Sequence, residues 1–406
     1  MRMNNKKEIV PKLRFPEFIG VKLKITTLGK ISSVVKEKAG ENKYTLMSVT
    51  SGVGLIPQAE KFGREIAGDS YKNYIVIKKY DFAYNKSATK QFPEGYISML
   101  GEYDIATVPN SIFTCFRITD NESYPPYFDC LWRNNYHGHW LRKYIEVGAR
   151  AHGALNVDIK HLWSMPLALP DFKEQQKIAD CLSSIDDLID AESRKLKALG
   201  KYKKGLTQKL FPAEGKTLPE FRFPEFKDYT EWDVDKLGNL CKITTGKLDA
   251  NAMVSNGKYR FYTCAKEFFQ IDKYAFNTEA LLISGNGANV GYIHYYKGKF
   301  NAYQRTYVLD QFDEDIHYIQ YYLERNLSCR INTEKNEGNT PYIVLNTLTD
   351  MDIFFPKDLK EQQKIAGCLS EIDAIITEQS NKIEQLKAHK KGLMQRLFPS
   401  LEEEDI

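Results

Sequence analysis

Two long segments of this chain carry apolar residues in alternating steps of four and three positions. This spacing repeats every seven residues and continues over about five repeats, which favours a coiled coil over an ordinary amphipathic helix. Each helix should run for about 38 residues, or about 57 Å at 1.5 Å per residue. The predicted interface residues are Ile178, Leu182, Ile185, Ile189, Leu196, Leu199 and Leu206 in the first segment, and Ile365, Leu369, Ile372, Ile376, Ile383, Leu386 and Leu393 in the second.

The two segments are near-copies of one another. Residues 174–183 read EQQKIADCLS and residues 361–370 read EQQKIAGCLS, an offset of 361 − 174 = 187. A second motif, RFPEF, occurs at 14–18 and again at 222–226, an offset of 222 − 14 = 208. The chain is therefore an internal repeat, with the order RFPEF, variable segment and helix occurring twice.

Polar residues interrupt the apolar pattern at matching places in both copies. Glu192 and Lys203 fill the two gaps in the first segment, and Gln379 and Lys390 fill them in the second. A proline precedes each segment and a Phe-Pro pair closes it, as expected for helix boundaries. The lysines and arginines elsewhere on these helices form either a solvated outer face or a docking surface for partner subunits or DNA phosphates.

The order of the repeats predicts how the helices meet. A short linker, residues 212–221, joins the end of the first helix to the second RFPEF, while the chain's own N-terminus supplies the first. The C-terminus should therefore lie beside the N-terminus. The simplest geometry is an antiparallel helix pair with a pseudo-two-fold axis and one globular domain at each end.

The two variable segments share little sequence but have the same pattern. Short β-rich runs, such as 74–84 and 111–119 in the first and 279–284, 292–296 and 305–309 in the second, alternate with polar loops. Each segment also contains a helical stretch, at 127–134 and 318–326. The predicted fold class is α+β, with two mostly-β domains separated by the coiled coil.

The repeats also set the predicted boundaries. They give a first domain at 1–169, a first helix at 170–212, a linker and second domain at 213–355, a second helix at 356–399 and an acidic tail at 400–406.

Several loops of the variable segments combine cationic side chains with Asn, Gln, Ser, Thr, Tyr and His. Cations suit phosphates, and forked Arg, Asn and Gln groups suit base edges in the major groove. The same composition is also that of ordinary surface turns. The candidate DNA contacts are Lys86, Ser87, Thr89, Lys90, Arg150, His152, Asn156, Lys258, Arg260, Asn286, Asn289, Tyr303, Gln304, Arg305, Asn339 and Thr340.

The sequence contains no convincing catalytic motif. Tyr124-Pro125-Pro126-Tyr127 lacks the polar acceptor that an amino-methyltransferase motif needs, and is better read as a turn before a helix. The glycines at 285–291 precede a strand pattern, which favours a hairpin turn over a dinucleotide loop. Pro170-Asp171 with Lys173 lies at a helix entrance and lacks the separated carboxylates of a nuclease. We expect no catalytic residue and no P-loop.

The composition excludes some classes of protein but does not indicate a function by itself. The net charge of +4 over 406 residues is too small to indicate a nucleic-acid partner by itself, and the many aromatics suit β-rich cores as well as base contacts. The seven cysteines show no zinc spacing, so we expect no metal site and free thiols in a reducing cytosol. The basic N-terminus lacks an apolar region after it, and no apolar run approaches the ~20 residues of a membrane span. We expect a cytoplasmic protein without membrane contact.

The repeated residues resemble one known family. EQQKIADCLSSIDDLI and EQQKIAGCLSEIDAII, followed by KKGLTQKLFP and KKGLMQRLFP, look like the two central repeats of type I restriction–modification specificity subunits, and RFPEF is similar to the lead-in of their variable domains. The resemblance covers the organisation of the whole chain and is weak inside the variable segments.

That resemblance implies a noncatalytic subunit in which two target-recognition domains read the halves of a bipartite site in double-stranded DNA. It implies two methyltransferase subunits and, in the full complex, two motor-nuclease subunits, which would bring S-adenosylmethionine, ATP and Mg²⁺. Half-sites one helical turn apart, about 34–36 Å, fit a coil of this length. Because the two domains differ, the site should be asymmetric.

Three other functions stay open at this point. The chain could be a self-sufficient methyltransferase, a tether that holds partners and ignores DNA sequence, or the subunit of a complex that only methylates.

Overall fold

The computed structural model describes residues 10–67, 69–111, 113–145, 155, 157–228, 232–333 and 342–399. The chain divides into two compact units, Met1–Glu192 with Lys382–Ile406 (unit 1) and Ser193–Asn381 (unit 2). The division cuts both long helices, α6 (Phe172–Leu210) and α10 (Leu359–Leu397), so each unit contains a part of each helix.

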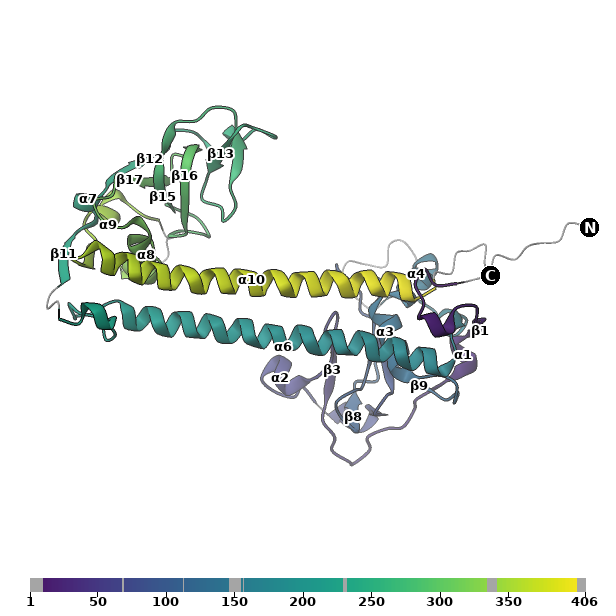
Figure 1. Ribbon diagram of the computed structural model, residues 1–406. Coiled ribbons are helices and arrows are strands. Elements are labelled where there is room, and N and C mark those ends of the chain that lie inside the picture. The colour runs from purple at the N-terminus through teal and green to yellow at the C-terminus, as the bar shows by residue number, and fades with distance from the viewer. Residues whose placement is uncertain are drawn as a thin grey trace, which may run out of the picture. The chain divides into compact units, whose positions relative to one another are not determined.

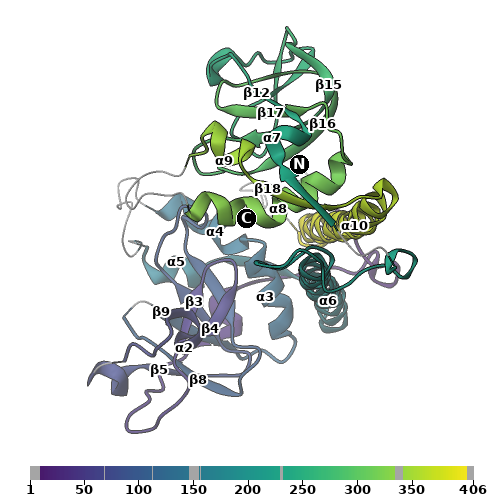
Figure 2. The ribbon, with the colours of Figure 1, turned by 90° about the vertical axis from the view of Figure 1, so that its left-hand side faces the viewer.

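The two long helices run antiparallel. In unit 1, Asp186 and Glu192 of α6 pair with Lys390 and Lys382 of α10, each at 2.5 Å, so the residue numbers rise along one helix as they fall along the other. Figures 1 and 2 show the two helices side by side from two directions. The predicted antiparallel two-helix coiled coil is confirmed.

Each long helix has 39 residues and therefore a length of about 58 Å. None of the fourteen predicted interface residues is exposed. Six are buried, namely Ile178, Leu182, Ile365, Leu369, Ile372 and Ile383, and the other eight are half-buried. Ile178, Leu182, Ile365 and Leu369 belong to the domain cores, whereas Ile372 and Ile383 are buried outside those clusters. Half-burial of the other eight is expected, because two helices alone cannot fully enclose a side chain.

The part of unit 1 between the RFPEF motif and α6, residues 24–169, is called domain 1. Its strands are β1 (Lys24–Thr27), β2 (Ser32–Val34), β3 (Met47–Thr50), β4 (Gly54–Pro57), β5 (Ile75–Lys78), β6 (Phe82–Asn85), β7 (Tyr96–Met99), β8 (Ile105–Val108), β9 (Phe113–Ile118) and β10 (Pro166–Leu169). Its helices are α1 (Leu28–Ile31), α2 (Gln58–Phe62), α3 (Pro125–Arg133), α4 (Tyr136–Leu141) and α5 (Ile159–Trp163), with 3-10 turns η2 (Asp69–Asn73) and η3 (Arg142–Tyr144).

Domain 1 is built on a four-stranded sheet in the order β2-β9-β6-β7, with two-stranded ribbons β3-β4, β5-β8 and β1-β10 beside it. The main core lies between this sheet, α3 and the two long helices. It includes Phe82, Phe116 and Trp132 of the domain together with Ile178 of α6 and Leu397 of α10. The domain therefore anchors on two helices that lie far apart in the sequence.

Domain 2, residues 232–356 of unit 2, has its own set of elements. Its strands are β11 (Trp232–Lys236), β12 (Lys242–Thr245), β13 (Tyr259–Tyr262), β14 (Phe269–Ile271), β15 (Phe276–Ser284), β16 (Ile293–Ala302), β17 (Thr306–Asp310) and β18 (Asp352–Pro356). Its helices are α7 (Leu237–Leu240), α8 (Ile316–Thr333) and α9 (Leu345–Thr349), with the 3-10 turn η5 (Ala250–Ala252).

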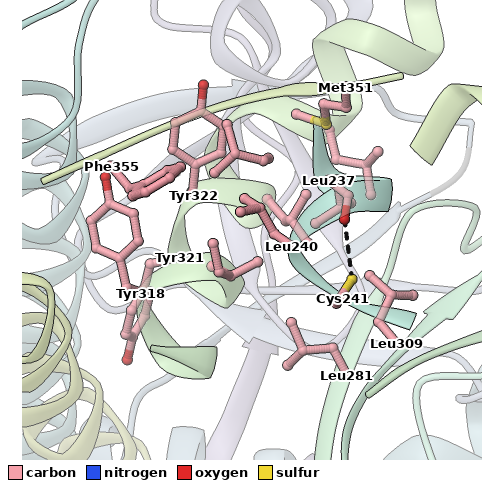
Figure 3. Close-up of a cluster of buried hydrophobic side chains, with 14 of the residues drawn as sticks. Leu237, Leu240, Cys241, Leu281, Leu309, Tyr318, Tyr321, Tyr322, Met351 and Phe355 are labelled. Carbon is pink, nitrogen blue, oxygen red and sulfur yellow. Dashed lines mark hydrogen bonds between the residues drawn. The ribbon is translucent and has the colours of Figure 1, made fainter. Parts of the chain in front are cut away.

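Domain 2 is built on a six-stranded sheet in the order β12-β17-β15-β16-β13-β14, in which only the β13–β16 pair is parallel. Figure 3 shows the core beneath it, where Leu281 and Leu309 of the sheet face Leu240 of α7, and Tyr318 and Tyr322 of α8 lie beside Phe355 of β18. Leu210 of α6 and Leu369 of α10 belong to the same cluster, so domain 2 also closes on both long helices.

The two domains share a common base despite their different sheets. In each, the first strand pairs antiparallel with the strand that leads into the long helix, β1 with β10 and β11 with β18. A short helix follows the first strand and packs so closely that a Cβ on Gly29 would lie 3.1 Å from Trp163, and one on Gly238 would lie 3.0 Å from Thr349. A side chain at either position would need its neighbour to move by a few tenths of an ångström, which favours glycine there.

The chain termini meet as the repeat order predicts. The PEF of each RFPEF motif forms a 3-10 turn, η1 (Pro16–Phe18) and η4 (Pro224–Phe226). Just before it, the Leu13 amide donates to the Arg396 carbonyl at 2.9 Å in unit 1, and the Phe221 amide donates to the Lys209 carbonyl at 2.9 Å in unit 2. The N-terminal arm thus docks on the end of α10 as the linker docks on the end of α6.

The structure differs from the sequence reading at residues 74–84. This run was expected as one strand, but it forms β5 and β6 with a turn between them. Tyr80 adopts a left-handed backbone (φ 72°), and the Asp81 carboxylate accepts a hydrogen bond from the Lys78 amide at 2.7 Å. A local side-chain hydrogen bond therefore ends the strand at the polar residues Lys78–Asp81, which interrupt the apolar run.

The first prediction concerns two equivalent Arg–Glu pairs. Arg14 and Arg222 each hold a glutamate of the repeated EQQ motif, Glu174 and Glu361, through two parallel hydrogen bonds of 2.7–2.8 Å. The Arg14 and Glu174 side chains are only 6% and 1% exposed, so Arg14→Ala would leave a buried, unpaired carboxylate. We expect this variant, and Arg222→Ala, to lose about 3–5 kcal/mol of unfolding free energy in urea denaturation.

The matched control is Lys24→Ala, which removes the ion pair of Lys24 with Glu122, whose side chains are 53% and 73% exposed. A surface pair of this kind should cost less than about 1 kcal/mol. Equal effects of the control and of Arg14→Ala would contradict the structural role assigned to the clamp.

Candidate nucleic-acid interface

In domain 1, four candidate residues lie in the connection between β6 and β7. The Asn85 carboxamide oxygen accepts from the Ser87 amide at 2.9 Å, and the Phe92 amide donates to the hydroxyl of Thr89 at 3.0 Å. These bonds hold the connection as a compact turn. Thr89 and Lys90 are exposed there, and Lys86 and Ser87 are half-buried.

The second candidate loop of domain 1 reaches the same place. Arg150, His152 and Asn156 lie outside the described residues. Leu155, beside Asn156 in the chain, donates its amide hydrogen to the Lys86 carbonyl at 2.8 Å. The structure therefore brings the end of this loop against the β6–β7 connection, although the two bonded residues are 155 − 86 = 69 positions apart in sequence.

A buried polar cluster supports this surface from below. The Glu94 carboxylate is buried and pairs with Arg142 at 2.5 Å. The Tyr84 hydroxyl donates to the Glu94 carbonyl at 2.8 Å, and the His137 ring lies with Nε2 3.4 Å from the Gly95 carbonyl. Burial lowers the pKa of His137 to about 4, so this ring is neutral at physiological pH.

In domain 2, five candidate residues gather on one rim of the sheet: Asn286, Asn289, Tyr303, Gln304 and Arg305. The Gly285 amide donates to the Arg305 carbonyl at 2.8 Å and so joins the β15–β16 and β16–β17 connections. The β15–β16 connection closes an antiparallel hairpin, as expected from its glycines.

The rim residues differ in whether their side chains already have hydrogen-bond or ion-pair partners. The Asn289 side-chain amide donates to the Cys264 carbonyl at 3.0 Å, and that of Gln304 donates to Asp249 at 2.9 Å, so both amides hold neighbouring loops. The exposed Arg305 side chain has no ion-pair partner within the described part of the chain. Arg305 is thus the rim residue with the most freedom to contact a ligand.

The remaining candidates of domain 2 lie elsewhere or are not described. Lys258 and Arg260 lie at the start of β13 and line a separate groove. Asn339 and Thr340 lie outside the described residues, but Tyr342, which follows them, forms a β-bridge with Asn286 of the rim.

The polar residues that hold each domain on the helices are not among the residues predicted from the sequence. Besides the Arg–Glu clamps, Gln175 accepts from the Tyr124 amide at 2.8 Å and donates to the Pro170 carbonyl at 2.9 Å. Gln362 makes the same bonds to the Asp315 amide and the Pro356 carbonyl, both at 2.9 Å. The signal was present in the identical EQQ and RFPEF motifs, because a polar residue kept in both copies has the same partner in both.

The seam lysines also have equivalent partners. Lys390 pairs with Asp186 at 2.5 Å in unit 1, and Lys203 pairs with Asp373 at 2.7 Å in unit 2. The sequence offset of 187 relates the two lysines and also the two aspartates. The repeated segments SSID (183–186) and SEID (370–373) therefore contain the aspartates that pair with the lysines interrupting the apolar pattern.

Each of these pairs also contacts the main helix of its domain, but through different chemistry. Arg133 of α3 lies 3.7 Å from Asp186, whereas the Tyr321 hydroxyl of α8 donates to Asp373 at 2.9 Å. Burial raises the pKa of Glu324, which lies 3.9 Å from Lys203. The Lys–Asp pair between the long helices is therefore the same in both units, whereas the domain residue that contacts it differs.

Residues of the two sequence motifs rejected as catalytic, around Asp171 and Pro125, have structural roles. Asp171 caps α6, because its carboxylate accepts from the Glu174 amide at 2.8 Å, and Pro125 opens α3 at its first turn. Among the residues that the structure describes, no cluster of three or more His, Cys, Asp or Glu side chains could hold a metal ion, and no helix has the length and apolar character to cross a membrane.

Comparison with known proteins identifies one family whose sequence model matches part of the chain. The family described as "Type I restriction modification DNA specificity domain" matches residues 229–388. The match covers domain 2 and most of α10, so the specificity domain includes the long helix that leaves it.

Individual relatives agree. A type I restriction enzyme EcoDI specificity subunit of Escherichia coli is 40% identical over 157 residues, which are 38% of this chain and 34% of that subunit. The crystal structure of a type I restriction–modification S subunit from M. genitalium has a TM-score of 0.61 at 14% identity and covers 97% of this chain and 100% of that one. A structure titled for complex assembly and conformational transition of the type I R-M system has a TM-score of 0.53 at 15% identity over 93% of this chain.

These findings confirm the resemblance to specificity subunits. In sequence the match spans about a third of the length of the E. coli relative. In fold it extends over nearly the whole chain. The chain therefore shares the fold of the M. genitalium S subunit over nearly its whole length.

The second prediction follows from the buried His137. In the unfolded chain its pKa returns to about 6.5, so between pH 6.5 and about 4 the unfolded state binds a proton that the folded state does not. The stability of unit 1 should be complete above pH 6.5 and fall by about 3 kcal/mol as the pH drops towards 4.

Urea unfolding of the whole chain, followed between pH 7.5 and 4.5, measures this slope. His137→Gln should flatten it, whatever its effect on stability at pH 7.5, and the control His139→Gln, at an exposed ring of the same helix, should not. An unchanged slope in His137→Gln would contradict the assignment.

Proposed function

We propose that this chain is the DNA sequence-recognition subunit of a type I restriction–modification complex. One observation carries the proposal: two domains with unlike loops are held on repeated anchors, namely the Arg–Glu clamps, the glutamines of EQQ and the Lys–Asp pairs. Identical anchors with different exposed loops are what a protein needs to present two different reading surfaces in one defined way.

Each domain, in this proposal, reads one half of an asymmetric bipartite site in double-stranded DNA. Support comes from the exposed polar and cationic side chains of the β6–β7 connection and of the rim, since such groups contact phosphates and base edges. The helix pair sets the spacing between the half-sites, for which its length of about 58 Å is sufficient.

The partners and chemistry are part of the same proposal. Two methyltransferase subunits dock on the helix pair, and two motor-nuclease subunits join in the full complex. This chain performs no catalysis and holds no cofactor, while S-adenosylmethionine, ATP and Mg²⁺ act in the partner subunits. The complex works in the cytoplasm, where the genome is methylated.

The third prediction tests the function itself. Methylome sequencing of cells that carry the intact gene should reveal a bipartite methyl-adenine motif that disappears when the gene is deleted. Methyl transfer by the purified chain alone would instead support a self-sufficient methyltransferase. Equal affinity of the assembled complex for all DNA sequences would support a tether without sequence recognition.

Exchange of one domain refines this test. Replacing residues 19–169 by the corresponding domain of another specificity subunit should change one half of the methylated motif and leave the other half intact. A change in both halves would contradict the independence of the two domains.

The fourth prediction tests the helix pair as a spacer. Residues 196–202 and 383–389 are equivalent heptads under the offset of 187, and their joint deletion keeps the Lys390–Asp186 and Lys203–Asp373 pairs aligned. Loss of seven residues shortens each helix by about 10 Å, or about three base pairs of DNA. The methylated motif should acquire a shorter spacer or vanish through failed assembly, and an unchanged spacer would rule out the proposed role.

A further inference from the structure

A groove of about 550 Å³ lies in domain 2 over β13, β14 and β16, apart from the rim. Three of the residues that line it are cationic, Lys258, Arg260 and Lys299, and none is acidic. Aromatic side chains form part of its wall, including Phe268, which is 43% exposed. Its local charge is therefore strongly positive, although the whole chain carries only +4.

The Arg260 side chain is held in a fixed position inside this groove. Its guanidinium carbon lies 4.2 Å from the centre of the Phe268 ring and 4.6 Å from that of Tyr296. Its Nη1 donates to the Tyr262 hydroxyl at 3.4 Å. The backbone of Arg260 is fixed as well, since β13 pairs with β14 on one side and β16 on the other.

The hydrogen-bonding edge of Arg260 is left available. Within the described part of the chain, its Nε and Nη2 groups have no hydrogen-bond partner, and no carboxylate pairs with the guanidinium. The two ring contacts restrain the guanidinium, while its Nε and Nη2, which share one edge of the planar group, stay free of protein partners. Such a donor pair matches the two in-plane acceptors of a guanine in the major groove, O6 and N7.

We propose that Arg260 is a specificity-determining residue that reads a guanine in the half-site of domain 2, while Lys258 and Lys299 contact the flanking phosphates. The inference rests on the proposed function of the chain. Because the rings already restrict the rotamers of Arg260, little conformational entropy is lost when it binds a base edge. Lys258 and Lys299 are exposed, with the Lys299 ammonium 4.9 Å from the centre of the Tyr274 ring, and a lysine charge suits contacts to phosphates that need little direction.

Arg305 of the rim gives the contrast. It is exposed and has no ring on either face among the described aromatic and cation–π contacts, so its fork has no fixed direction. Base reading is assigned to Arg260 because two rings restrain its planar donor pair, and backbone contact to the lysines because an ammonium group has no planar fork. Charge alone would not distinguish them.

The experiment compares variants of the assembled complex in cells and in solution. Arg260→Lys keeps the charge and the aliphatic stem but removes the fork, so it should fold with an unchanged melting temperature. We expect it to relax the preference for guanine at one position of one half-site about ten-fold or more, in the methylated motif and in binding to a panel of oligonucleotides. Arg260→Gln should do the same.

Lys299→Ala should weaken binding equally for all sequences and reduce the dependence of binding on salt by about one counterion, without changing the motif. Lys297→Ala is the matched control, since Lys297 lies on the same strand and pairs with Glu279 outside the groove. It should alter neither the motif nor the salt dependence.

The outcomes separate the inference from the function on which it rests. If the wild-type complex shows no bipartite motif, the proposed function fails. If the wild type shows a motif and Arg260→Lys preserves every position of it, the function stands and the reading role of Arg260 is overturned. A loss of preference that spreads over both half-sites would likewise overturn it, because it would indicate a general weakening of DNA binding.

Discussion

The contact between α6 and α10 is the interaction on which the rest of the structure depends. Two helices alone bury their seam only in part, and eight of the fourteen apolar seam residues are half-buried. The ends are completed by the two domains, whose cores take up Ile178 and Leu397 on one side and Leu210 and Leu369 on the other. Neither domain closes its core without residues from both helices, so folding of the domains and pairing of the helices are coupled.

The polar interruptions of the seam give this contact its register. A continuous leucine and isoleucine seam could slide by one heptad at small cost, whereas Lys203 and Lys390 are fixed by Asp373 and Asp186. A displaced register would leave four partly buried charges without partners, which is unfavourable. Polar groups at seam positions therefore act as they do in other coiled coils, where they select one alignment at some expense of stability.

The internal repeat also shows which contacts the two halves of the chain share and which parts differ between them. The clamps of Arg14 and Arg222, the bonds of Gln175 and Gln362 and the close approaches at Gly29 and Gly238 occur twice with the same geometry. The sheets and loops they carry differ in strand order and in exposed side chains. A constant base under a variable surface is the arrangement that a recognition subunit with two unlike half-sites requires.

The sequence by itself determined the repeat, the long antiparallel helices, the meeting of the termini and the α+β class, because heptad spacing and motif order are local properties. It also pointed to loops rich in Asn, Gln, Lys and Arg. Only the tertiary structure decided that the amides of Asn289 and Gln304 donate to neighbouring loops, that residues 74–84 form two strands, and that Arg260 contacts the rings of Phe268 and Tyr296. The physical reason is that the freedom of a polar side chain depends on partners brought to it by the fold, and those partners are not its neighbours in sequence.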